Sequence, residues 1–178
     1  MNLPNILTSV RMVLIIPFVI LMQTAFEGNG RFLALAIFII ASLTDFLDGY
    51  IARKNHLVTN FGKFMDPLAD KLLVSAAMIC LTAMGKLPAW VVIVIISREF
   101  TISGFRLIAA DNGIVIAASW WGKFKTVSQM IMIILLIADF GGFFDVLEQA
   151  FIWIALVLTV VSLIDYIRKN SQVLKMQS

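Results

Sequence analysis

Residues 45–70, DFLDGYIARKNHLVTNFGKFMDPLAD, join the two apolar runs 32–44 and 72–85. Four aspartates lie in this stretch, Asp45 and Asp48 before its polar middle and Asp66 and Asp70 after it. Spacings of three and four residues put each pair on one face of a helix. Because a short connection joins the two helix ends, we expect all four carboxylates to come together there.

The composition around this stretch is typical of a membrane protein. Of the 178 residues, 61% are hydrophobic and 14% are charged, whereas soluble domains have about 45–50% and roughly 25%. A soluble globular enzyme and a disordered chain are therefore excluded. Six apolar windows approach the roughly 20 residues that a spanning helix needs: 5–26, 32–52, 67–85, 87–109, 120–139 and 147–167. We expect an all-α integral membrane fold with six transmembrane helices, forming a single domain over residues 1–178.

The positions of lysine and arginine predict the orientation. If the N-terminus is inside, 12 of the 14 basic residues lie in inner loops or at inner helix ends, and only Arg31 and Lys86 lie outside. Both termini are then cytoplasmic. Apart from Asp139 and Glu148, the charges within the windows lie toward the inner end, and charges at membrane depth need water or one another. We therefore expect a polar active-site cavity open to the cytoplasm. The net charge of +3 is too small to indicate a nucleic-acid partner.

The four carboxylates predict a metal centre. Like charges a few ångströms apart would force protonation unless cations lie between them. An all-oxygen ligand set favours Mg²⁺ or Mn²⁺ over zinc, and two ions bridged by shared aspartates suit phosphoryl transfer. Asp66 before Pro67 also fits a helix N-cap with proline at the first helical position. That interpretation would explain Asp66 alone, not the set of four.

The spacer between the aspartate pairs is suited to a phosphate-bearing ligand. Gly49 and Gly62 allow a bulky group to approach the backbone, and Ala52 leaves the same face uncrowded. Arg53 offers two parallel donors to a phosphate. Cys80 is the only cysteine, so no disulfide within the chain can form.

The stretch resembles the signature of the CDP-alcohol phosphatidyltransferase family, with all eight fixed positions at the family's spacing: Asp45-x2-Asp48-Gly49-x2-Ala52-Arg53-x8-Gly62-x3-Asp66-x3-Asp70. The resemblance implies a homodimeric membrane enzyme that uses Mg²⁺ or Mn²⁺, two ions per subunit, to displace CMP from CDP-diacylglycerol. It implies metal ligation by Asp45, Asp48, Asp66 and Asp70, with Asp70 also the general base. The CDP-lipid contacts that it implies are Thr8, Arg11, Gly49, Ala52, Arg53, Thr59 and Gly62. Arg11 alternatively anchors the inner membrane boundary.

Four cations at inner helix ends point to the acceptor alcohol: Arg98, Arg106, Lys123 and Lys125. Guanidinium groups bind phosphate oxygens in pairs, so a cationic pocket suits an acceptor that is itself a phosphomonoester. The alternative is that these cations set the topology and pair with Glu99. The motifs Ser97-Arg98-Glu99-Phe100 and Gly122-Lys123-x-Lys125-Thr126 resemble those of family members that use sn-glycerol 3-phosphate.

Other functions stay open at this point. Inositol phosphate or phosphatidylglycerol could replace glycerol 3-phosphate as the acceptor. A divalent-cation transporter is the alternative from another class, because aspartates inside a membrane also mark ion paths. Transport predicts charged groups that continue toward the outer side, where Asp139 and Glu148 are the only charged residues within these windows. Asp165 could cap its helix, pair with Arg168 or face the cavity.

Overall fold

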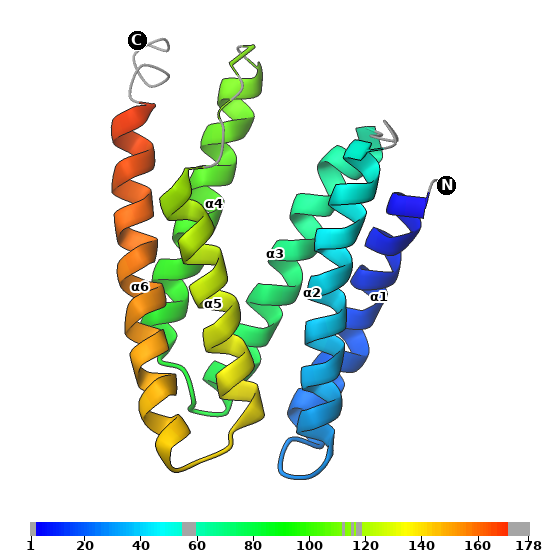
Figure 1. Cartoon of the computed structure of the whole chain (residues 1–178), viewed down its shortest axis with the longest axis vertical. Helices are drawn as coiled ribbons and strands as arrows, with labels where there is room; N and C mark the ends of the chain where they lie inside the picture. Colours follow the sequence, from blue (N-terminus) through cyan, green and yellow to red (C-terminus); the bar gives the residue numbers. More distant parts are fainter. Residues whose placement is uncertain (1–2, 55–59, 112, 115, 117–118, 171–178) are drawn as a thin grey trace. The chain divides into compact units, whose positions relative to one another are not determined.

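The computed structural model describes residues 3–54, 60–111, 113–114, 116 and 119–170. In this part of the chain the regular structure consists of six α-helices (Figure 1). They are α1 (Leu3–Thr24), α2 (Gly30–Lys54), α3 (Asn60–Ala83), α4 (Ala89–Asp111), α5 (Trp120–Ala138) and α6 (Phe143–Lys169). Each of the six apolar windows falls on one helix, which confirms the all-α prediction.

Helix α3 differs from the prediction at its start. It begins at Asn60, so Asp66 and Pro67 lie inside the helix rather than at its first turn. The N-cap interpretation of Asp66 is therefore wrong. A proline inside an apolar helix is tolerated where neighbouring groups satisfy the carbonyl that it leaves without a donor. As a result Asp66 and Asp70 lie one turn apart on one continuous helix.

Three helices are long and apolar enough to cross a membrane, among the residues that the structure describes: Ile6–Thr24, Trp120–Ala138 and Phe143–Lys169. Among the residues searched, α2 also contains the apolar segment Gly30–Thr44, and charged residues follow in the second half of this helix. Three such helices indicate a multi-pass membrane protein.

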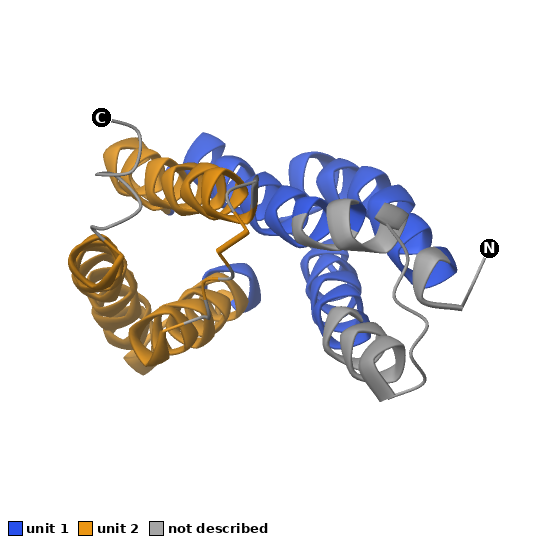
Figure 2. Ribbon diagram, turned by 90° about the horizontal axis from the view of Figure 1, so that it is seen from above, with its two compact units in different colours: residues 1–86, 136–138 blue, residues 87–135, 139–178 orange. Residues whose placement is uncertain are grey.

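The chain divides into two compact units, residues 1–86 with 136–138 and residues 87–135 with 139–178 (Figure 2). In the first unit α1 packs against both α2 and α3. The rings of Phe18 and Phe38, both fully buried, meet with their centroids 6.0 Å apart. Ala34 and Ala41 flank Phe38 on the buried face of α2, and such small residues let helix backbones approach closely.

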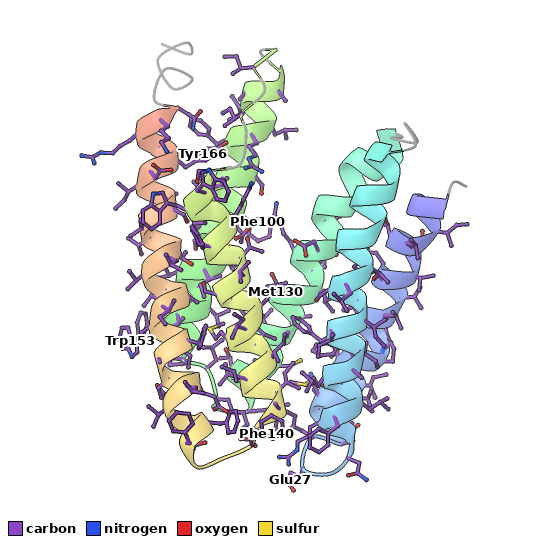
Figure 3. All side chains as sticks on the ribbon, in the orientation of Figure 1. Glu27, Phe100, Met130, Phe140, Trp153 and Tyr166 are labelled. Atoms are coloured by element: carbon purple, nitrogen blue, oxygen red, sulfur yellow. The ribbon has the colours of Figure 1, made fainter. Side chains whose placement is uncertain are left out.

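In the second unit α4 packs against α6. Trp90 at the beginning of α4 contacts Trp153 in the first half of α6, with ring centroids 6.1 Å apart, and Phe105 contacts Tyr166 near the ends of both helices at 5.6 Å (Figure 3). The two helices therefore run parallel. Helix α5 begins after Ser119, whose Oγ accepts a hydrogen bond from the backbone N–H of Gly122.

Candidate active site

The aspartate-bearing ends of α2 and α3 lie in the first unit. Helix α2 runs through positions 45 and 48, and α3 runs through positions 66 and 70. The end of α2, the beginning of α3 and the beginning of α1 lie at the same end of this unit (Figure 1). The backbone thus brings the two helix segments that carry the predicted ligands to one end of the unit.

Only one of the four predicted metal ligands has a described side chain. Asp70 is half-buried and stands beside the fully buried Ala69. The side chains of the other predicted residues in this stretch lie outside the described residues: Asp45, Asp48, Gly49, Ala52, Arg53, Gly62 and Asp66, together with all of Thr59. Among the side chains that are described, no group of three or more metal-ligating residues occurs. The metal centre therefore stays a prediction.

The buried face of α1 becomes polar toward its N-terminus. Thr8 and Arg11 are each 1% exposed and follow the same three-and-four spacing as the buried Phe18 and Met22. All four side chains thus lie on the face of α1 that packs on α2 and α3. On the opposite face large apolar side chains are exposed, Ile16 among them.

The contact between Phe18 and Phe38 serves as a reference point for the position of Arg11 along the axis of this helix bundle. Helices α1 and α2 run in opposite directions (Figure 1). Seven residues back along α1 lead to Arg11, and seven residues forward along α2 lead to position 45. Both steps cover about 10.5 Å at the helical rise of 1.5 Å per residue. A buried guanidinium therefore lies at the level of the first aspartate of the signature.

Two of the predicted acceptor cations are brought together in the second unit. Glu99 Oε1 lies 3.4 Å from Arg98 Nη1 and also forms an ion pair with the Lys125 ammonium. Lys125 is 2% exposed and Arg98 is 9% exposed. Helices α4 and α5 thus contribute one cation each to a buried cluster, and the pairing with Glu99 that the sequence allowed is present.

The other two cations lie elsewhere in this unit. Arg106 is exposed, and its guanidinium carbon lies 5.7 Å from the centre of the Tyr166 ring. The Lys123 ammonium lies 4.4 Å from the centre of the exposed Trp120 ring. Because residues two apart on a helix do not face the same way, Lys123 and Lys125 cannot both join the buried cluster.

Two features of this unit go beyond the sequence prediction. Tyr166 is 2% exposed, and its hydroxyl has no hydrogen-bond partner among the described residues. Its only sequence signal is a phenol at the end of an apolar run. Asp165 forms an ion pair with Lys169, one helical turn further along α6, at 2.8 Å, and not with Arg168 as the sequence allowed.

Comparison with known proteins finds a family match and several similar bacterial proteins. Residues 1–161 match the family model described as CDP-alcohol phosphatidyltransferase. The chain is 50% identical to a CDP-diacylglycerol–glycerol-3-phosphate 3-phosphatidyltransferase of Bacillus subtilis, over 98% of this chain and 97% of that protein. It is 40% identical to a protein of the same description from Haemophilus influenzae, over 94% and 92%. It is also 39% identical to a probable phosphatidylglycerophosphate synthase of Mycobacterium tuberculosis, over 94% and 81%.

Proposed function

The chain belongs to the CDP-alcohol phosphatidyltransferase family, and from this membership we propose that it transfers a phosphatidyl group from CDP-diacylglycerol to sn-glycerol 3-phosphate. The products are phosphatidylglycerophosphate and CMP, and the reaction belongs to phospholipid biosynthesis. The observation that carries the proposal is the near-full-length similarity to bacterial enzymes of that description. The cations of the second unit also support it, because guanidinium groups suit a phosphorylated acceptor.

The ligand set fits divalent metal. Asp45, Asp48, Asp66 and Asp70 are oxygen donors only, and their two helix segments share one end of the first unit. Such a set suits Mg²⁺ or Mn²⁺, and we infer two ions per subunit. When bound, the metal neutralises charge on the pyrophosphate and on the departing phosphate.

Asp70 is the proposed general base. Its carboxylate takes the proton from the 1-hydroxyl of glycerol 3-phosphate, and the hydroxyl oxygen bonds to the lipid-side phosphorus of the donor. The bond between this phosphorus and the bridging oxygen breaks, and CMP leaves with that oxygen. Asp70 is half-buried rather than sealed in the core, as a residue that exchanges protons with a substrate must be.

The remaining substrate contacts are proposed from the charge of the side chains and from the space that small residues leave for the ligand. We assign the donor's CDP group to Thr8, Arg11, Gly49, Ala52, Arg53, Thr59 and Gly62. The buried position of Arg11 at the level of Asp45 supports its part in this set. The cations of the second unit, Arg98, Arg106, Lys123 and Lys125, are assigned to the acceptor-phosphate site, either in contact with the phosphate or orienting a residue that is.

The placement in the cell follows from the same features. We propose six membrane spans in the cytoplasmic membrane, both termini in the cytoplasm, a polar cavity on that side and a homodimer. The three long apolar helices support the multi-pass part of this proposal. The distribution of lysine and arginine supports the orientation.

A panel of acceptors tests the function. Purified protein with CDP-diacylglycerol and Mg²⁺ receives glycerol 3-phosphate, inositol phosphate, phosphatidylglycerol or no acceptor, and CMP release is measured. We expect release with glycerol 3-phosphate alone. If CMP is released only with another alcohol, that alcohol is the acceptor instead of glycerol 3-phosphate. No release with any alcohol, together with divalent-cation flux into vesicles that contain the protein, would favour the transporter.

A further inference from the structure

Glu99 connects two helices through the buried cations of the second unit. It lies on α4 beside Arg98 and reaches Lys125 on α5, and one carboxylate oxygen, Oε1, contacts both cations. The Lys125 side chain is 2% exposed, whereas that of Glu99 is 24% exposed. Lys125 is thus the deeper partner, and its charge is directed at Glu99.

The cluster of Arg98, Glu99 and Lys125 carries two positive charges and one negative charge. A buried cation without a compensating charge is strongly destabilising. Glu99 lies between the two cations and compensates part of their charge.

One edge of the Arg98 guanidinium contacts Glu99, and the edge that carries Nε does not. Its Nη1 faces Glu99 at 3.4 Å. Its Nε is buried and has no hydrogen-bond partner among the residues that the structure describes. The side chain as a whole is 10% exposed. Nε and Nη2 lie along the same edge of a guanidinium, and this pair of parallel donors matches two oxygens of a phosphate.

Gly122 borders this edge from α5. A Cβ atom at position 122 would lie 3.6 Å from Arg98 Nη2. That is an ordinary contact distance, so alanine fits there without moving the backbone. The added methyl would nevertheless occupy the space beside Nη2, which the glycine leaves empty.

We propose that Glu99 is a positioning residue for the acceptor: it holds Arg98 so that the Nε–Nη2 edge, kept clear at Gly122, receives the phosphate of glycerol 3-phosphate. Lys125 holds the Glu99 carboxylate in place through their ion pair. This inference rests on the proposed function and goes beyond it. It assigns the phosphate contact to Arg98, and it assigns to Lys125 the role of orienting that contact through Glu99.

Kinetics of the full chain in lipid vesicles test the role of Glu99. Glu99→Gln keeps the shape of the side chain and removes its charge. We expect the KM for glycerol 3-phosphate to rise about tenfold or more, the effect of losing one charge-assisted hydrogen bond. The KM for CDP-diacylglycerol should stay within twofold, and Glu99→Asp should recover part of the loss. Glu27→Gln, at an exposed position between α1 and α2 (Figure 3), is the matched control.

The variant Gly122→Ala tests whether the Nε–Nη2 edge of Arg98 contacts the phosphate, and it does so without removing any charge. It should raise the KM for glycerol 3-phosphate and weaken competition by inorganic phosphate, while the melting temperature does not fall. Gly104→Ala is its control, because a Cβ at this position of α4 meets nothing within 4 Å.

The outcomes separate the two proposals. If the unaltered chain releases no CMP with glycerol 3-phosphate, the proposed function fails. If it is active and Glu99→Gln lowers only the melting temperature, Glu99 is merely structural and the inference is overturned. If Glu99→Gln does not fold, Gly122→Ala decides, and an unchanged KM in that variant excludes the Nε–Nη2 edge as the phosphate contact.

Discussion

Replacement of Arg11 by lysine tests whether the buried end of α1 binds the donor. Lysine keeps the positive charge, and hence the charge distribution that orients the chain. It lacks the planar pair of donors that binds two phosphate oxygens at once. If Arg11 contacts the pyrophosphate of CDP-diacylglycerol, Arg11→Lys should raise the KM for this substrate, and Arg11→Met should raise it further.

The magnitude follows from the burial and the level of this residue. Arg11 is 1% exposed, so water offers little replacement for a lost contact. Loss of a charge-assisted hydrogen bond costs about 1.5–3 kcal/mol, and each 1.4 kcal/mol is about tenfold in affinity. We therefore expect a KM for CDP-diacylglycerol about tenfold to a hundredfold higher in Arg11→Met. The KM for glycerol 3-phosphate should change little.

The assay measures CMP release in vesicles at varied mole fractions of CDP-diacylglycerol. Arg31→Lys serves as the control, because position 31 lies fourteen residues before position 45 on α2, about 21 Å along the helix. An unchanged KM in both Arg11 variants, with altered membrane orientation in Arg11→Met, would refute the reasoning. Arg11 would then be a boundary anchor only.

Three further predictions concern the metal, the base and the acceptor. Excess chelator should abolish CMP release, and Mg²⁺ or Mn²⁺ should restore it; full activity in chelator would contradict the carboxylate centre. Asp70→Asn should lower turnover by about 10²–10⁴-fold while CDP-diacylglycerol still binds, and near-normal turnover would mean that another group takes the proton. Arg106→Ala should raise the KM for glycerol 3-phosphate but not for CDP-diacylglycerol. An unchanged acceptor KM would leave Arg106 as a cation stacked on Tyr166.

The six helices and the family could be predicted because their signals are local. Apolar windows identify each helix, and glycines mark several of the connections between them. Gly85 and Gly141 adopt positive φ angles of 73° and 72°, a conformation that side chains disfavour. The start of α3 could not be predicted in the same way. Asp66-Pro67 has the local pattern of a helix start, yet the helix begins at Asn60.

The acceptor cations show where sequence reasoning stops. Spacing alone puts Lys123 and Lys125 about 200° apart around α5, but it does not say which side faces α4. Packing of α5 buries Lys125 against Glu99 and leaves Lys123 exposed beside Trp120. The choice depends on a contact between residues 26 positions apart, which no local pattern contains.

The sequence by itself determined the helical class, the membrane character and the eight-position signature, because composition, hydropathy and fixed spacing are properties of the chain read in order. The tertiary structure alone decided that Arg11 is buried at the level of Asp45 and that Glu99 joins Arg98 to Lys125. Both facts depend on the register and the facing sides of neighbouring helices. Packing between side chains distant in the sequence sets these, Phe18 against Phe38 in the first unit and Glu99 against Lys125 in the second.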